Sequence, residues 1–432
     1  MVPSAVLPNL YKLADINYSR GNHQFFVDGT PVAADVHDAT GWHTILVGGL
    51  NGGGKGYYAL DITDPTAPTA LWEFKQNSGV CPGSSAAAVG NSSDCNLGLS
   101  YGKPVVTKLG GTWVVMFTSG YNNRNGVPGD DQGFLYVVNA MTGTVIHKIG
   151  TGVGSNANPG GLAQINNYVD NVLVDNTTLR AYGGDLLGNI WRFEFPPAAP
   201  AAVLVGTATT GGGAAQPITT RPEIAELNGH PFVMVGTGKL LGLTDITDVE
   251  AQSVFGVTDP LTAGPVYPAL RGALKNLAMT QIGAGAGAVR TIACTLNCAS
   301  TDGWVVDLPE SGERVNVDMK LVLGTLVFSS NVPDGQACSV GGHSWLNQLD
   351  FRTGVAVSTA PVVGASGVIS NYLNDSLNVG FNVVQLPPRA GELNGRYEAI
   401  ARQGDGSRLT PPVYVAPPGP SGRRISWREI VQ

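Results

Sequence analysis

Five cysteines are the residues of this chain whose chemistry depends most clearly on spacing: Cys81, Cys95, Cys294, Cys298 and Cys338. Cys81 and Cys95 flank a segment rich in Gly, Ser, Ala and Asn, which suits a disulfide that closes a loop. Cys294 and Cys298 could close a second loop, or either could pair with Cys338. Zinc is the rival, but zinc sites use Cys-x-x-Cys pairs or nearby histidines, and the six histidines are scattered singly. The spacing predicts disulfides and an oxidising compartment.

Carboxylates are the second group that could do chemistry. Asp130 and Asp131 end an oxygen-rich stretch, residues 122–131, which is either a cation site or an exposed insertion tip. None of the motifs Gly-x-Ser-x-Gly, His-Glu-x-x-His or Gly-x-x-x-x-Gly-Lys occurs, so no hydrolase nucleophile, catalytic zinc or phosphate loop is indicated. We therefore predict a binding protein and not an enzyme.

Short strands must position these residues. A pattern recurs along the chain: an apolar strand with an aromatic residue, then Asp or Asn, a turn and a second strand. The clearest copies span residues 57–74 and 134–149, and weaker copies begin at residues 188, 253, 303 and 344. Strands that end in glycines precede the copies at residues 44–49, 113–120, 180–185 and 232–238. Alternation and β-branched content indicate strands, and Thr-Gly and Thr-Asp-Pro indicate hairpin turns.

Composition restricts the class of protein. Glycine accounts for 59 of 432 residues, roughly twice the usual share, and charged residues for only 13%. A helical bundle, a collagen and a disordered chain are excluded. The net charge of −7 argues against nucleic acid, and no apolar stretch is long enough to span a membrane. The start of the sequence lacks a signal peptide, so we expect a cytosolic protein or a fragment of a secreted one.

Together these features predict an all-β chain, a β-propeller with long loop insertions, against the alternative of a β-sandwich. The insertions are expected at residues 76–102, 121–132 and 150–178, and residues 1–432 are expected to form one domain. Prolines make residues 410–432 an extended C-terminal tail that closes on the propeller. The recurrent tryptophans should pack between blades, with Trp42 near one end of the chain and Trp427 near the other. Tyr168 and Tyr372 should lie in loops as contact residues.

Seven motifs in order resemble one family, the type IV pilus biogenesis factor and tip adhesin family (PilY/PilC). They are FVDGTP (26–31), WHTILVGGL (42–50), GKGYYALDITDP (54–65), GGDLLGNIWRF (183–193), QPITTRPE with GTGKL (216–223 and 236–240), SGERV (311–315) and SGRRISWRE (421–429). The resemblance implies a modified seven-bladed β-propeller, the C-terminal half of an exported protein about twice as long. Such a protein acts at the pilus tip, outer membrane or cell surface. It supports pilus extension, twitching motility and adhesion through contacts with pilus and minor pilin components, secretin or host surface receptors.

The resemblance also raises the question of calcium. Members of the family carry an Asp-rich calcium loop before the Gly-Asp-Leu-x-Gly-Asn motif, and the matching residues here are 166–179. Asp170, Asn171, Asp175 and Asn176 remain as candidate ligands, but the loop lacks its glycine and has leucines where ligands are expected. We expect a degraded calcium site, the alternative being a loop in which Asp and Asn cap their own backbone.

Two other functions fit a propeller. One is a quinone-dependent oxidoreductase, whose blades share the Tyr-x-x-Asp-x-x-Thr-Gly pattern, although many such enzymes use adjacent cysteines and none occur here. The other is a glycan-binding adhesin, suggested by the long loops. Some members of the family use an Arg-Gly-Asp tripeptide, which is absent from this sequence.

Overall fold

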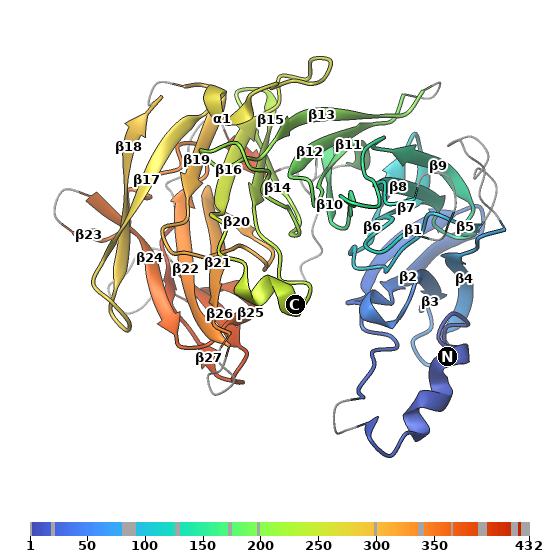
Figure 1. The fold of residues 1–432 in the computed structure, drawn as a ribbon. Helices are drawn as coiled ribbons and strands as arrows, with labels where there is room; N and C mark the ends of the chain where they lie inside the picture. Colours follow the sequence, from blue (N-terminus) through green and yellow to red (C-terminus); the bar gives the residue numbers. More distant parts are fainter. Residues whose placement is uncertain are drawn as a thin grey trace. The chain divides into compact units, whose positions relative to one another are not determined.

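The repeated strand–turn–strand pattern forms antiparallel strands joined by tight turns (Figure 1). The structure is a computed structural model. It describes residues 2–18, 22–79, 92–124, 126, 130–171, 175–196, 199–297, 300–335, 341–363, 366–387, 395–415 and 422–424. In these residues the regular structure is almost all strand, with only short helical turns, which confirms the all-β prediction.

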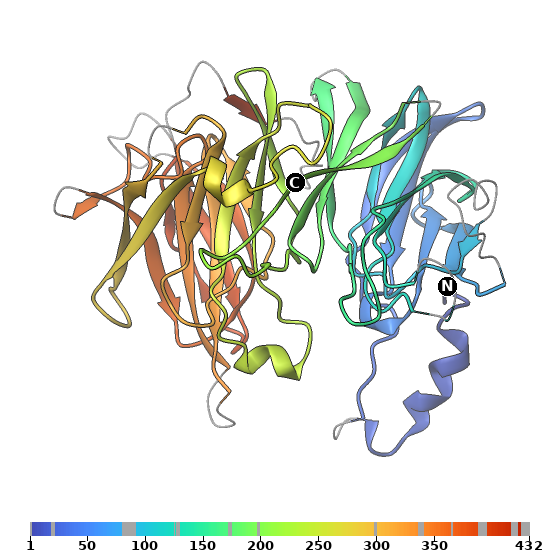
Figure 2. The same ribbon diagram turned by 45° about the horizontal axis from the view of Figure 1, so that its top comes forward.

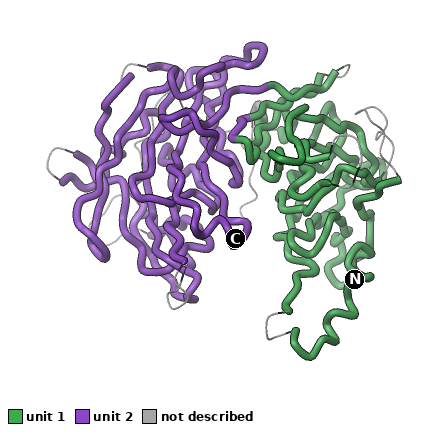
Figure 3. The backbone as a smooth tube through the Cα atoms, in the orientation of Figure 1, with its two compact units in different colours: residues 1–187, 191–203, 426–432 green, residues 188–190, 204–425 purple. Residues whose placement is uncertain are grey.

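The described chain divides into two compact units (Figure 3). The first contains residues 1–187 and 191–203, and the second contains residues 188–190 and 204–425. The boundary falls within strands β12 (Asn189–Glu194) and β13 (Ala201–Thr207), which belong to one sheet. The expectation of one domain over residues 1–432 stays a prediction.

The first unit contains a five-stranded sheet in the order β1-β2-β3-β4-β5. Its strands are β1 (Val32–Asp38), β2 (Gly41–Gly49), β3 (Gly56–Asp61), β4 (Thr69–Gln76) and β5 (Ser93–Asp94). The 3₁₀ helices η1 (Leu7–Ala14) and η3 (Asn51–Gly53) lie before and between these strands. Buried aromatic side chains, among them Tyr57, Phe74, Phe117 and Tyr136, form a core with the next sheet.

That next sheet has the order β13-β12-β11-β6-β7-β8-β9, with β10 paired to β11. Its remaining strands are β6 (Val105–Leu109), β7 (Thr112–Thr118), β8 (Phe134–Asn139), β9 (Val145–Gly150), β10 (Ile165–Asn171) and β11 (Asp175–Gly184). Each of the two clearest sequence copies is an antiparallel pair, β3 with β4 and β8 with β9, as predicted.

The second unit contains a larger sheet in the order β20-β21-β22-β24-β18-β17-β19-β16-β15-β14-β29. Its strands are β14 (Glu223–Leu227), β15 (His230–Gly236), β16 (Ser253–Thr258), β17 (Lys275–Ile282), β18 (Val289–Leu296), β19 (Gly303–Asp307), β20 (Lys320–Val322), β21 (Thr325–Pro333), β22 (Gly342–Asp350), β23 (Val362–Val363), β24 (Ser366–Asn374) and β29 (Gly422–Arg424). The helical turns η5 (Leu243–Thr247) and α1 (Leu270–Ala273) lie in its connections. A smaller sheet contains β25 (Asn378–Leu386), β26 (Arg396–Gln403), β27 (Arg408–Leu409) and β28 (Pro412–Val413).

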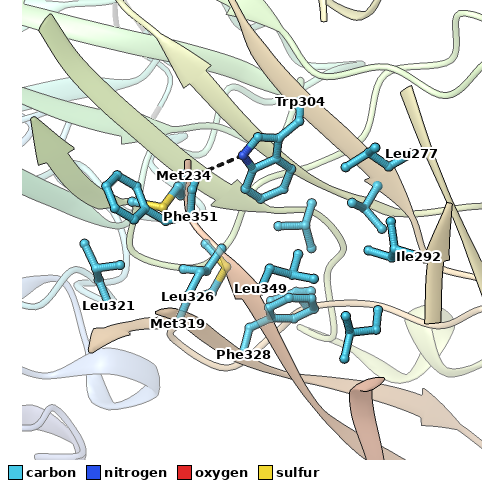
Figure 4. Close-up of a cluster of buried hydrophobic side chains, with 14 of the residues drawn as sticks. Met234, Leu277, Ile292, Trp304, Met319, Leu321, Leu326, Phe328, Leu349 and Phe351 are labelled. Atoms are coloured by element: carbon cyan, nitrogen blue, oxygen red, sulfur yellow. Dashed lines mark hydrogen bonds between the residues drawn. The ribbon is translucent and has the colours of Figure 1, made fainter. Parts of the chain in front are cut away.

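Two tryptophans explain the recurring Thr-Gly turn. Trp72 donates its indole N–H to the Ala140 carbonyl at 2.8 Å, and a Cβ at Gly143 would lie 2.6 Å from its ring. Trp304 repeats the arrangement in the second unit, where its indole donates to the Phe351 carbonyl at 2.8 Å (Figure 4). A Cβ at Gly354 would lie 2.6 Å from its ring. Each ring packs on a turn glycine that has a positive φ.

Five expectations from the sequence need correction or limits. Residues 150–178 are not only an insertion, because they contain β10 and the start of β11. Trp42 is 64% exposed rather than packed, and Tyr168 lies in β10 at 7% exposure rather than in a loop. Tyr372 lies in strand β24 and not in a loop. Trp427 lies outside the described residues.

The described part of the C-terminal tail consists of two short strands. β28 pairs with β26, and β29 pairs antiparallel with β14, with Arg424 opposite Ala225. The described residues of the tail therefore add to sheets of the second unit as extended strands, and the closure of the whole tail on the propeller stays a prediction.

Candidate functional site

A buried arginine connects four segments of the second unit. Arg290 on β18 donates from Nη1 to Glu313 Oε1 at 2.6 Å and from Nη2 to Glu310 Oε1 at 2.6 Å. Gln281 Oε1, on the neighbouring strand β17, accepts from Nη2 at 3.1 Å. The two glutamates come from the connection between β19 and β20, which contains the Ser311–Val315 motif. We call Arg290, Glu310, Glu313, His343 and Trp345 the arginine cluster.

Burial makes this pairing necessary. The side chains of Arg290 and Glu313 are both 0% exposed, and a buried charge is strongly destabilising unless it is paired and hydrogen-bonded. The guanidinium also stacks 3.7 Å from the ring centroid of Trp345 on β22, a cation–π geometry. Removal of one member would therefore leave another buried charge without compensation.

The outer side of the cluster is half-buried and titratable. Trp345 Nε1 donates to Glu310 Oε1, and His343 Nε2 lies 2.8 Å from Glu310 Oε2. The hydrogen bond to Glu310 raises the pKa of His343 above its usual value, against the opposing effect of burial. Burial alone would raise the pKa of Glu310, but His343, Arg290 and Trp345 outweigh it and lower that pKa. Tyr372 on β24 stacks on His343 with ring centroids 5.5 Å apart.

The inner side continues as a polar chain across three strands. Ser330 on β21 donates to Glu313 Oε1, and Asn347 on β22 donates to Ser330 Oγ at 2.9 Å. Ser370 on β24 donates to Asn347 Oδ1 at 2.5 Å. All of these side chains are buried, so the chain of hydrogen bonds fixes the register of the neighbouring strands.

Arg314, the next residue of the same motif, organises a loop. Its Nη1 donates to the Lys239 carbonyl at 2.9 Å, and its Nη2 donates to the Asp248 carbonyl at 2.5 Å. Asp245 Oδ2 accepts from the backbone N–H groups of Leu241 and Gly242 at 2.8 and 3.1 Å. We call residues 239–250 the Arg314 loop. The GTGKL motif enters it through Gly238, whose φ is +120° and whose Cβ position lies 2.3 Å from Arg314 Cβ.

The Arg314 loop exposes apolar side chains although its backbone is fixed. Leu243 is 85% exposed, Val249 69% and Leu241 47%. Figure 2 shows the helical turn η5 of this loop standing out from the strands of its own unit. A fixed loop that presents clustered apolar side chains to solvent has the character of a contact surface.

The arginine cluster and the Arg314 loop together hold segments in place. Every charge of the cluster faces an opposite charge or a hydrogen-bond partner, and the Ser330 hydroxyl beside Glu313 is buried and accepts a hydrogen bond from Asn347. Across the part of the chain that the structure describes, no three His, Cys, Asp or Glu side chains are grouped as metal ligands. The geometry is that of a rigid scaffold beneath an exposed apolar loop.

The GGDLLGNIWRF motif makes a separate local contact in the first unit. Asp185 Oδ1 accepts from the backbone N–H of Leu187 at 2.9 Å, and its Oδ2 accepts from Trp191 Nε1 at 2.8 Å. The aspartate thus closes the turn before β12 and orients the tryptophan. The spacing of Asp185 and Trp191 in the motif is therefore explained by this hydrogen bond.

The predicted calcium ligands lie on the β10–β11 hairpin. Asp170 and Asn171 are near the end of β10, and their side chains are outside the described part of the structure. Asp175 Oδ1 accepts from Thr177 at 2.8 Å and lies 3.3 Å from Lys108 Nζ. Asn176 Oδ1 accepts from Thr107 Oγ1 at 3.3 Å. The two described ligands are engaged by protein donors, one of them cationic. The degraded calcium site stays a prediction.

The Asp130–Asp131 pair is also engaged. Arg124 Nη2 lies 2.9 Å from Asp131 Oδ2, and Asp130 Oδ2 accepts from the Gly126 backbone N–H at 2.7 Å. Arg124 and Asp131 line a shallow hollow with Lys55, Leu99, Asn122 and Pro159. The pair therefore fixes its own loop in the described residues.

The structure bears on the cysteines only in part. Cys95 and Cys294 are each disulfide-bonded. Cys81, Cys298 and Cys338 lie outside the described residues, so the predicted connectivity remains a prediction.

Sequence reasoning missed the arginine cluster. The Ser311–Val315 motif pointed to Glu313 and Arg314, but Arg290 has no local signal in a strand of ordinary composition. Its partners become neighbours only through the pairing of β18 with β24 and of β22 with β24. The one sign in the sequence is an arginine placed among the apolar residues of a strand, because arginine is rarely buried unless it is paired.

Comparison with known proteins places this fold in a class, the β-propellers. The family model described as the PilY1 beta-propeller domain matches residues 2–282. The crystal structure of the Pseudomonas aeruginosa PilY1 C-terminal domain superposes with a TM-score of 0.69 at 25% identity, and the match covers 93% of this chain and 87% of that one. The chain belongs to the PilY1 β-propeller domain family.

Curated relatives are longer than this chain. The type IV pilus biogenesis factor PilY1 of Pseudomonas aeruginosa is 30% identical, and the match covers 99% of this chain and 39% of the relative. A PilY1 homolog of Xylella fastidiosa is 32% identical, with 100% and 33% covered. The chain thus spans between a third and two fifths of the length of these relatives. None of the helices in the described residues is long and apolar enough to cross a membrane.

Proposed function

We propose that this chain supports type IV pilus biogenesis as a non-enzymatic module that acts through protein–protein contacts. The observation that carries the proposal is the family match over residues 2–282, together with relatives named as type IV pilus biogenesis factors. The partners are pilus and minor pilin components, and secretin or host surface receptors are further candidates. Twitching motility and surface attachment follow from a role in pilus extension.

The proposal places the protein outside the cytoplasm, at the pilus tip, outer membrane or cell surface. Two disulfide-bonded cysteines, Cys95 and Cys294, support an oxidising compartment. Calcium is not required in this proposal, because Asp175 and Asn176 already have protein partners.

The Arg314 loop is the surface that we assign to the pilus contact. Leu241, Leu243 and Val249 are exposed, and the hydrogen bonds from Arg314 and Asp245 hold the backbone that carries them. A preformed loop loses little conformational entropy on binding, so exposed apolar area there converts efficiently into affinity. Leucine side chains in this setting suit an apolar groove on a pilin-like partner.

Deletion of the gene tests the function, and single substitutions test the surface. A deletion strain should lose surface pili and twitching, and the wild-type gene should restore both. Leu243→Asp should lower surface piliation several-fold without changing protein level or melting temperature, because the side chain makes few internal contacts. Val379→Asp is the matched control, since Val379 is also exposed in the second unit, at 65%.

The outcomes separate the two parts of the proposal. Normal piliation, motility and adhesion in the deletion strain would overturn the function. A deletion phenotype that Leu243→Asp and Val379→Asp both rescue fully would keep the function and overturn the assignment of the Arg314 loop.

A further inference from the structure

A lysine of the first unit lies in a closed, aromatic pocket that the proposed function does not use. Lys148 is on β9, directly opposite Tyr136 on β8, and its side chain is 2% exposed. Its Nζ lies 2.7 Å from Asn96 Oδ1 and 2.9 and 3.0 Å from the two carboxylate oxygens of Asp94. Asp94 is 0% exposed and Asn96 is 1% exposed.

The pocket around these three groups is apolar. The ammonium lies 4.6 Å from the ring centroid of Phe134, and the Tyr136 hydroxyl donates to Asp94 Oδ1 at 2.9 Å. Phe74 and Phe117 pack on Tyr136 with centroids 5.4 and 5.5 Å from it. The ammonium and the carboxylate are therefore enclosed by aromatic rings, with side chains 2% and 0% exposed.

The segment that carries Asp94 and Asn96 is held in place from several sides. β5 pairs in parallel with β4, with Asp94 opposite Gln76. The Asp94 carbonyl accepts from the Asn77 backbone N–H at 3.1 Å, and Asp94 Oδ1 accepts from the Asn96 backbone N–H at 2.9 Å. Cys95, between the two side chains, is disulfide-bonded. A nucleophile, an amide and a proton carrier are thus fixed together, which is the condition for an efficient intramolecular reaction.

We propose that Lys148 and Asn96 become joined by an isopeptide bond, with Asp94 as the residue that moves the proton. Asp94 takes a proton from Lys148, and the neutral Nζ attacks Cγ of Asn96. Asp94 then gives that proton to Nδ2 of Asn96 as the Cγ–Nδ2 bond breaks, and ammonia leaves. Asp94 takes up the second proton that Nζ loses. The products are a secondary amide, a protonated carboxyl group and ammonia, and no oxidant or cofactor is consumed.

A second Lys–Asp pair of the same unit provides an internal comparison. Lys108 Nζ lies 3.3 Å from Asp175, but the lysine side chain is 31% exposed and the aspartate side chain 51%. Water therefore reaches both side chains of that pair, and they are not enclosed as Lys148 and Asp94 are. The bond is expected at Lys148 and not at Lys108.

Mass spectrometry of the purified chain tests the inference. After reduction and alkylation in denaturant, the intact mass should lie about 17 Da below the mass of the sequence with its five cysteines alkylated, corresponding to one lost ammonia. Because trypsin does not cleave after a modified lysine, residues 125–180 should remain one peptide, joined to residues 76–108. A succinimide at an asparagine would lose the same mass, but it would leave Lys148 cleavable and the two peptides separate.

Substitutions test the roles of the three residues. Asn96→Ala and Asp94→Ala should both show the unshifted mass, with cleavage after Lys148 restored, whereas Lys108→Ala should keep the joined peptides. A wild-type chain whose mass equals the sequence mass would overturn the inference and leave an ordinary buried ion pair. A loss of about 18 Da, one water, would place the bond on a carboxyl group and overturn the assignment to Asn96.

Discussion

Glu313 and Arg314 are adjacent in the sequence but stabilise different parts of the second unit. Glu313 faces the interior and neutralises Arg290, while Arg314 faces a loop and donates to its backbone carbonyls. Both residues are buried, and both would carry an uncompensated charge if their partners were removed. One short motif thus fixes the sheet on one side and the Arg314 loop on the other.

Substitution of Arg314 should loosen that loop. Arg314→Met removes the guanidinium donors to the carbonyls of Lys239 and Asp248, and the loss should cost about 2–4 kcal/mol of unfolding free energy. Hydrogen exchange should rise in residues 239–250, and urea unfolding should show the lower stability. Arg396→Met is the control, because Arg396 pairs with Glu398 at a partly exposed position. Unchanged exchange in the Arg314 loop would contradict the role of this residue.

His343 should make stability depend on pH in a definite direction. Its pKa is raised in the folded chain by the hydrogen bond to Glu310, so its contribution is complete below its ordinary value of 6.5. The contribution is lost as pH rises through the raised pKa. The melting temperature of the wild type should therefore fall more than that of His343→Gln as the pH rises above 6.5.

His43 also has a raised pKa, caused first by its hydrogen bond to Asp61, and this histidine is present in both proteins. The difference between the two melting curves therefore reports the effect of His343 alone. Glu310 affects stability at acidic pH. Its pKa is lowered in the folded chain, so its contribution to the unfolding free energy is lost as the pH falls below the ordinary glutamate range. Parallel curves for wild type and His343→Gln would show that the pair does not influence stability.

At the scale of elements, the sequence showed the strands of the recurring pattern but did not show others, of which β10 is an example. The copies at residues 57–74 and 134–149 begin with runs of apolar and aromatic residues that end at Asp or Asn, and they form β3–β4 and β8–β9. β10 was missed because it buries polar side chains. Asn166 and Asn167 are buried, and Asn167 Nδ2 donates to Thr178 Oγ1 at 2.9 Å. A strand whose interior contacts are hydrogen bonds has no hydrophobic alternation to read.

The turn glycines that lie beneath tryptophan rings should not tolerate a side chain. Gly354 has φ +71°, and a Cβ there would lie 2.6 Å from the Trp304 ring. Gly354→Ala should lower the unfolding free energy by about 2–4 kcal/mol through strain and overpacking, measured by urea unfolding. Gly380→Ala is the control, since nothing lies within 4 Å of its Cβ position. Equal stabilities would show that the contact between ring and turn is loose.

At the scale of the molecule, the fold could be predicted from the sequence, but the arginine cluster and the exposed Arg314 loop could not. Ordered motifs pointed to a β-propeller of the PilY1 family, and the family match confirms it. The arginine cluster was hidden because its members lie on strands far apart in sequence, and only the sheet order brings them together. The assignment of contacts to the Arg314 loop needed side-chain exposure, which a motif does not record.

Calcium gives a test for the whole chain. We expect the melting temperature to be unchanged by a calcium chelator, because Asp175 lies beside Lys108 and Asn176 is bonded to Thr107. Differential scanning calorimetry with EGTA and with excess Ca²⁺ measures this, and Mg²⁺ serves as the control for ionic effects. A fall in melting temperature with EGTA that Ca²⁺ reverses would restore a calcium site to residues 166–179.

The pairing of β29 with β14 has a consequence for the order of folding. Arg424 lies opposite Ala225, so the edge of the second unit's sheet is completed by residues about two hundred positions later in the chain. Until those residues are available, β14 presents unpaired backbone groups, the usual starting point for misassociation between chains. A chain that emerges from its N-terminus therefore carries this open edge from the appearance of β14 until residues 422–424 follow.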